Sequence, residues 1–189
     1  MREILEFTIE GCRLVGTHHQ AEISPNQTRE GPATNRGIGI LLFNSGFLPR
    51  SPVGDLTAHI ADHFARQGLP SFRFDMPGLG DSDGDLPPGV QTFFASVQDG
   101  LHGRPAAILS RELVDRFGLK GMVLGGLCGG AITSVYAAAS KEGGKIAGIV
   151  LLDPGFETLS PMGEQNRKQS ALQRFATTIK SKAKQTYQA

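Results

Sequence analysis

A single cysteine framed by glycines has the residue type and spacing of a nucleophile. Gly126 and Gly130 flank Cys128 in a Gly-x-Cys-x-Gly pattern, after the apolar residues 120–125 and at the start of the helix-forming residues 129–142. This order predicts a strand, a tight turn and a helix, because glycines let a strand and a helix approach closely. The sulfur would then lie at a helix N-terminus, where unpaired N–H groups and the helix dipole favour the thiolate. The alternative is a small residue buried under a helix, and the glycine frame favours the reactive thiol.

The histidines that could act as a base or hold a metal ion all precede this cysteine. They are His18, His19, His59, His63 and His102. His59 and His63 are four residues apart on a predicted helix, a spacing that could hold a metal ion on one face. No carboxylate or cysteine completes the pair at a suitable spacing, so two surface histidines are the favoured interpretation. We therefore expect no bound metal and no cofactor.

Other motifs that could hold a ligand are absent from the sequence. Residues 81–85, Asp-Ser-Asp-Gly-Asp, begin like a calcium loop, but Leu86 and Thr92 stand where an EF-hand needs glycine and glutamate. No Walker-type or dinucleotide-type glycine loop occurs, so a phosphate-binding loop is unsupported.

The elements that must position the cysteine can be read from the apolar pattern. The pattern predicts strands that alternate with helices, which favours an α/β fold with a mostly parallel sheet flanked by helices. Residues 3–9 and 12–23 are expected to form an N-terminal hairpin at the sheet's edge. The continuous apolar runs at 37–43 and 146–152 predict buried strands. Further strands are predicted at residues 70–75 and 120–125, and helices at 55–67, 90–102, 105–117 and 129–142.

The composition is that of an ordinary globular protein of one domain. Of 189 residues, 39% are apolar and 20% are charged, and the net charge of +1 gives no indication of nucleic-acid binding. The chain has no apolar leader, no run long enough to span a membrane and only two cysteines, which predicts a cytoplasmic protein without an integral membrane segment. Residues 161–189 are rich in Lys and Arg and have a weak apolar stripe, which predicts a basic amphipathic helix.

Three segments, taken in order, resemble the α/β-hydrolase superfamily. They are Ser-Gly-Phe at 45–47, Phe-Arg-Phe-Asp-Met-Pro-Gly-Leu-Gly-Asp-Ser-Asp-Gly at 72–84, and Gly-Leu-Cys-Gly-Gly at 126–130. The Leu-Cys elbow and the strand at 148–152 further resemble hydrolases associated with exosortase systems. Cysteine at the elbow is also seen in dienelactone hydrolases and polyhydroxyalkanoate synthases. The resemblance implies the N-terminal portion of an α/β-hydrolase fold over residues 1–160, truncated there, with a lid-like tail at 161–189.

The resemblance also implies roles for individual residues. Cys128 matches the nucleophile, and the N–H of Gly129 matches one donor of the oxyanion hole. The second donor would come from the loop after the 37–43 strand, at the N–H of Phe47. Asp153 ends the last strand, where some members place the acid. The superfamily order is nucleophile, acid, histidine, and no histidine follows Cys128, so a turn before Pro154 is the favoured interpretation of Asp153.

Two functions of different classes remain open. The first is ester or thioester hydrolysis, or acyl transfer, through Cys128 on a small-molecule acyl substrate, with the base supplied by another chain or from an unusual position. The second is a non-catalytic remnant of the fold that acts as a binding or dimerising module. An incomplete sheet would expose an apolar edge, so a homodimer through that edge or the C-terminal helix is expected in the second case.

Overall fold

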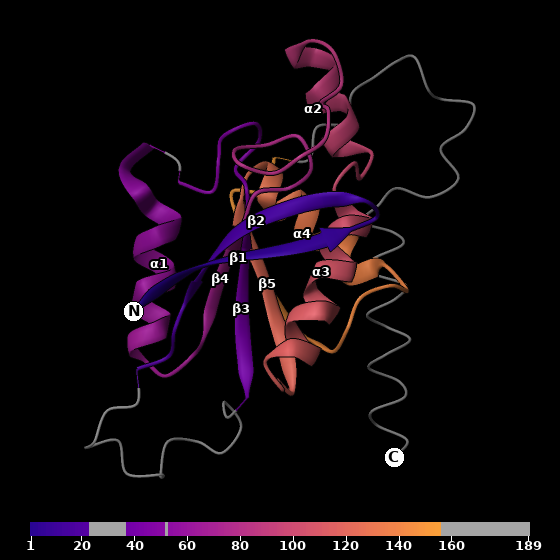
Figure 1. Ribbon diagram of the computed structural model, residues 1–189. Coiled ribbons are helices and arrows are strands. Elements are labelled where there is room, and N and C mark those ends of the chain that lie inside the picture. The colour runs from indigo at the N-terminus through magenta and orange to yellow at the C-terminus, as the bar shows by residue number, and fades with distance from the viewer. Residues whose placement is uncertain (23–36, 52, 156–189) are drawn as a thin grey trace.

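The chain folds into one six-stranded sheet with helices on both faces (Figure 1). The structure is a computed structural model that describes residues 1–22, 37–51 and 53–155. Its elements, in chain order, are β1 (Arg2–Ile9), β2 (Cys12–His19), β3 (Ile38–Phe43), a 3-10 turn η2 (Val53–Asp55), α1 (Leu56–Arg66), β4 (Ser71–Phe74), α2 (Val90–Gln98), α3 (Gly103–Arg116), β5 (Gly121–Leu127), α4 (Gly129–Ala139) and β6 (Ile146–Leu152).

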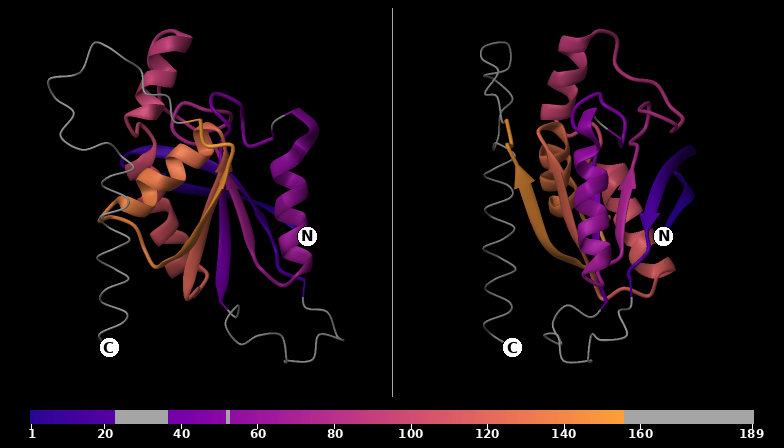
Figure 2. Two further views of the ribbon diagram at one scale, coloured as in Figure 1. Left: turned by 180° about the vertical axis from the view of Figure 1, so that it is seen from behind. Right: turned by 90° about the vertical axis from the view of Figure 1, so that its left-hand side faces the viewer.

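The sheet is mostly parallel, with an antiparallel hairpin at one edge. Its strand order is β1-β2-β4-β3-β5-β6. The β1–β2 hairpin turns at Glu10 and Gly11, both at positive φ, and β2 continues antiparallel to β4. The strands β4, β3, β5 and β6 are parallel. Figure 2 (right) shows the hairpin and β6 at opposite sides of the molecule. The expected α/β fold with an N-terminal hairpin is confirmed.

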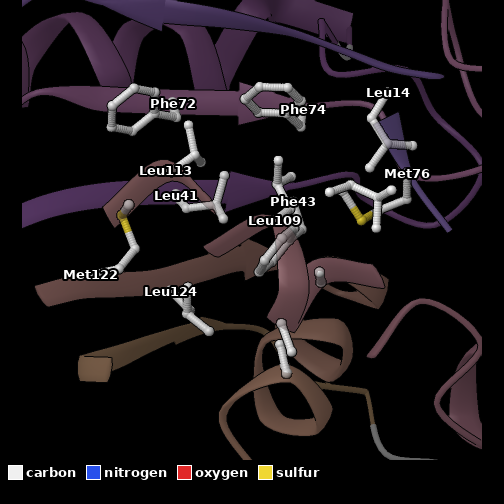
Figure 3. Packing of buried hydrophobic residues seen from close by; sticks show 14 of the residues in the cluster. Leu14, Leu41, Phe43, Phe72, Phe74, Met76, Leu109, Leu113, Met122 and Leu124 are labelled. Carbon is white, nitrogen blue, oxygen red and sulfur yellow. The ribbon is translucent and has the colours of Figure 1, made fainter. Parts of the chain in front are cut away.

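Alternation along the central strand sorts the core into two layers. Ile40 and Leu42 of β3 pack against Ala61 of α1, on one face of the sheet. Leu41 and Phe43 point to the other face, where α3 and α4 cover the larger cluster. That cluster includes Phe72, Phe74, Met76, Leu109, Leu113 and Leu124, and Figure 3 shows Leu41 and Phe43 of β3 between the β4 rings and Leu124 of β5. Burial on both faces explains why β3 reads as an unbroken apolar run.

The sequence prediction that β6 is buried is wrong. This strand lies at the edge of the sheet, with β5 as its neighbour, and Val150 and Leu152 are 50% and 37% exposed. Ile146 and Ile149 pack partly against the main core, so the described residues cover only one face of this strand. An apolar run indicates a strand suited to burial, but it does not show whether a further strand or helix covers it.

The parallel strands carry the segments of interest to one end of the molecule. Cys128 follows β5, residues 44–50 follow β3, and α2 stands beyond the carboxyl ends of these strands (Figure 1). Among the described residues, no helix has the length and apolar character needed to cross a membrane. The predicted boundary at residue 160 and the basic tail lie outside the described residues.

Candidate active site

Cys128 occupies a strained turn between β5 and α4. Its backbone has φ 53° and ψ −113°, a conformation that a non-glycine residue rarely adopts. The predicted sequence of strand, tight turn and helix is therefore confirmed. The side chain is half-buried and unpaired, and no hydrogen bond joins its Sγ to any side chain in the described part of the chain.

The flanking glycines are required because the backbones approach too closely for a side chain. An ideal Cβ on Gly126 would lie 2.6 Å from the carbonyl carbon of Gly130. A Cβ on Gly130 would lie 2.7 Å from the backbone oxygens of both Phe43 and Asn44. These distances are shorter than any carbon contact tolerates, so the Gly-x-Cys-x-Gly pattern reports this turn directly.

The segment after β3, residues 44–50, lies against the start of α4. We call it the β3 loop. An ideal Cβ on Gly129 would lie 2.9 Å from the Gly46 nitrogen and 3.0 Å from its Cα. Gly46 has a positive φ of 60°, and the next residue, Phe47, turns its ring outward against Phe94 of α2, with the ring centroids 5.8 Å apart. The structure therefore brings the backbones of Gly129 and Phe47 to the same end of β3 and β5.

Asp153 follows β6 as Cys128 follows β5. Leu127 pairs with Leu152 in the register of the two strands, and the Cys128 N–H donates to the Leu152 carbonyl at 3.0 Å. Asp153 itself is exposed, has a φ of 46°, and accepts a hydrogen bond on its carbonyl from the Gly155 N–H at 2.9 Å. The backbone therefore turns at Asp153, and this turn leaves the residue exposed at the end of β6.

The two histidines of β2 lie at the other end of the sheet. His18 and His19 pair with Phe72 and Ser71, at the amino end of β4. His18 stacks on the Phe72 ring at 4.7 Å, and burial lowers its pKa. His19 donates from Nδ1 to Asp62 at 2.6 Å and accepts at Nε2 from Arg73 at 2.9 Å, so its ring is neutral. Burial also lowers the pKa of His19, against the opposing effect of Asp62.

Among the described residues, the remaining histidines form no hydrogen bond with the thiol either. His59 and His63 are exposed on α1, as the surface interpretation predicts, and no group of three or more His, Cys, Asp or Glu among the described residues is suited to hold a metal ion. His102, the last residue of the predicted 90–102 helix, lies directly before α3 and is buried. Its Nε2 has no hydrogen-bond partner, and burial lowers its pKa to about 4.

Sequence reasoning missed a buried polar network behind the β3 loop. Asn44, Arg50 and Asp75 join the loop to the segment after β4 through several hydrogen bonds. Asn44 directly follows β3 and Asp75 directly follows β4, and the two strands are parallel neighbours. Polar residues placed directly after adjacent parallel strands were the signal that could have indicated the contact.

The arrangement matches the N-terminal portion of an α/β-hydrolase fold, and solved structures that contain it are similar to this chain. The α/β hydrolase GrgF from Penicillium sp. sh18 matches with 22% identity and a TM-score of 0.51, over 82% of this chain and 46% of its own. A cold-adapted esterase from an Arctic intertidal metagenomic library matches with 17% identity and a TM-score of 0.54, over 79% and 59%. The epoxide hydrolase CorEH matches with 19% identity and a TM-score of 0.53, over 91% and 49%.

These comparisons establish the fold of the chain. The chain spans 46% to 59% of the length of the three structures. No protein-family model matches the sequence, and no curated protein does. The closer resemblance to exosortase-associated hydrolases and the roles of Cys128, Gly129, Phe47 and Asp153 stay predictions.

Proposed function

We propose that the chain acts in ester or thioester hydrolysis, or in acyl transfer, with Cys128 as the nucleophile. The main support is the strained backbone of Cys128, which holds its side chain at the start of α4. The β3 loop lies against the following residue, Gly129. A strained conformation persists only where the surrounding structure enforces it, and such positions cluster at reactive sites. The similar esterase and epoxide hydrolase share the fold, which supports a hydrolase as the class of protein.

The proposed reaction begins with attack by the Cys128 thiolate on the carbonyl carbon of the substrate. A carbon–sulfur bond forms, and the carbonyl π electrons move to the oxygen. The oxyanion then collapses and expels an alkoxide or thiolate, which takes a proton from water. The product is a thioester on Cys128, and water or a second acceptor cleaves it to regenerate the thiol.

The N–H groups of Gly129 and Phe47 are the proposed donors to the oxyanion. The start of a helix leaves its first N–H groups without intrahelical partners, and Gly129 is the first residue of α4. Phe47 follows Gly46, whose backbone touches Gly129. Each preorganised donor lowers the barrier by roughly 3 kcal/mol in characterised acyl-transfer enzymes.

Deacylation requires a base that the described residues do not place at the thiol. No histidine follows Cys128 in the sequence, and the described ones lie elsewhere. We propose that this base comes from another chain or from an unusual position, with Asp153 at the end of β6 as the acid that orients it. Without that base, the acyl group is expected to remain on Cys128.

Intact-protein mass spectrometry with an activated ester tests the proposed function. The wild-type chain should gain one acyl group that persists for many minutes, and peptide mapping should place it on Cys128. Cys12→Ser removes the other cysteine and should leave the result unchanged, whereas Cys128→Ser should abolish the stable adduct. If neither the wild-type chain at Cys128 nor the Cys128→Ser variant is acylated, the proposed function is contradicted.

The exposed face of β6 favours a second candidate, a binding module that dimerises. Val150 and Leu152 lie exposed on a strand at the sheet's edge, and such edges readily pair with another chain. Sedimentation at micromolar concentration should then show a dimer, and Val150→Lys should shift the population to monomer. A wild-type monomer under these conditions would contradict this candidate.

A further inference from the structure

A fully buried carboxylate lies behind the β3 loop, with every acceptor position occupied. Asp75 Oδ1 accepts from Asn44 Nδ2 at 2.9 Å and from the Arg50 backbone N–H at 2.5 Å. Its Oδ2 accepts from the Asp81 N–H at 3.1 Å and from the Arg50 guanidinium. The same guanidinium also contacts the Asp81 carboxylate at 2.9 Å. Hydrogen bonds between charged groups are roughly twice as strong as neutral ones. This cluster therefore joins the β3 loop rigidly to Asp75, directly after β4, and to Asp81.

The space around the carboxylate is shaped to receive it. Gly80 lies directly beside Asp75, and an ideal Cβ on Gly80 would overlap the carboxylate oxygens. The Asp75 side chain is 0% exposed and that of Arg50 is 13% exposed, so water screens the pair weakly. A buried charge without these partners would cost several kcal/mol, which explains the dense set of donors around it.

Asn44 transmits this rigidity to the β3 loop. Its side chain donates to Asp75 and to the Leu48 carbonyl at 3.0 Å, and it accepts from the Met76 N–H at 2.8 Å. The Leu48 N–H donates in turn to the Ser45 carbonyl at 3.2 Å. The loop is therefore closed into a turn around Gly46 and Phe47, and the turn is held from behind by side chains that do not reach the thiol.

The direction of the Phe47 N–H depends on this turn. Gly46 and Gly129 are in backbone contact, so a shift of the β3 loop changes the spacing between the two proposed oxyanion donors. Such donors act only when they lie about 3 Å from the developing oxyanion, and a misplacement of about 1 Å can cost a hundredfold in rate.

We propose that Asp75, acting through Asn44 and Arg50, is a positioning residue that sets the geometry of the oxyanion hole. The proposal rests on the function proposed above, since it concerns the same site. Asp75→Asn keeps the shape of the side chain but presents an NH2 group to the Asp81 N–H and the Arg50 guanidinium. Donors then face donors, and the β3 loop loses its fixed attachment.

Two reactions of the same thiol separate positioning from a general structural role. Acylation by an activated ester develops an oxyanion, whereas alkylation by iodoacetamide displaces iodide and develops none. Both rates are measured for Cys128 in a Cys12→Ser background. Asp75→Asn should slow acylation about tenfold to a hundredfold and leave alkylation within about twofold. Asp83→Asn removes an exposed carboxylate from the same segment and should change neither rate.

A second variant guards against misfolding of the first. Arg50→Met removes the guanidinium but keeps the backbone N–H that donates to Asp75. It should slow acylation by about tenfold, again with alkylation unchanged. If Asp75→Asn does not fold, the acylation and alkylation rates of Arg50→Met decide between a positioning role and a general structural role. Equal loss of both rates in a folded variant, or unchanged acylation, would overturn the positioning role. If the wild-type chain is not acylated while alkylation proceeds, the proposed function itself fails.

Discussion

Replacing Gly130 by alanine is expected to destabilise the fold by about 2 kcal/mol and to abolish acylation of Cys128. Alanine favours a helix by about 1 kcal/mol over glycine, which alone would stabilise α4. However, the added Cβ would lie 2.7 Å from the backbone oxygens of Phe43 and Asn44. Neither oxygen belongs to a flexible side chain, so α4 must move away from β3, at a cost of roughly 3 kcal/mol. Steric overlap therefore outweighs helix propensity at this position.

Urea denaturation measures this change, and Gly148→Ala provides the matched control. A Cβ on Gly148 in β6 would meet Val123 at 3.9 Å, an ordinary contact. The control should stay within about 0.5 kcal/mol of the wild type and keep its acylation. A Gly130→Ala variant as stable as the wild type would show that the strand and helix at Cys128 are not in tight contact.

The folded chain is expected to lose about 3 kcal/mol of stability as the pH falls from 6.5 to 4, through protonation of His102. The pKa of His102 falls from 6.5 to about 4 because the ring is buried without a partner for Nε2. As the pH decreases, the unfolded chain therefore takes up the proton first, and protonation favours unfolding. The stability is complete above pH 6.5 and is lost through that window, at about 1.4 kcal/mol for each pH unit of difference. His18 and His19 change stability in the same direction.

Urea denaturation across this pH range, for the wild type and for His102→Phe, checks the assignment. Phenylalanine keeps an aromatic ring beside Phe93 but cannot take up a proton. The variant should lose much less stability between pH 6.5 and 4, and its difference from the wild type above pH 7 should be constant. Equal acid sensitivity in both proteins would place the titration elsewhere.

The turn at Cys128 could be predicted from the sequence because its requirements are local. Positive φ at the cysteine and the close approach of β5 and α4 demand glycine at Gly126 and Gly130, so the residue types record the geometry directly. The same holds for the strands and helices, whose apolar periodicity reflects which face is buried. Neither the glycine pattern nor the apolar periodicity depends on the order of the strands in the sheet.

Features that depend on distant segments could not be predicted. Asn44 and Asp75 are 31 residues apart and each reads as an ordinary turn residue. Only the pairing of β3 with β4 brings them together. The burial of His102 depends on distant residues such as Phe93 of α2, whose ring lies beside it, and the exposure of β6 depends on its place at the edge of the sheet. None of these is encoded in the residues next to the position concerned.

The outward ring of Phe47 has a consequence for the electrostatics of the reaction. Phe47 and Phe94 are 52% and 37% exposed, so bulk solvent reaches this side of the proposed oxyanion hole. The attraction between an N–H dipole and a negative oxygen weakens as the local dielectric constant rises toward that of water. A bound molecule that lays hydrocarbon over the two rings would lower that dielectric constant, so the apolar part of a substrate would strengthen the stabilisation of its own transition state.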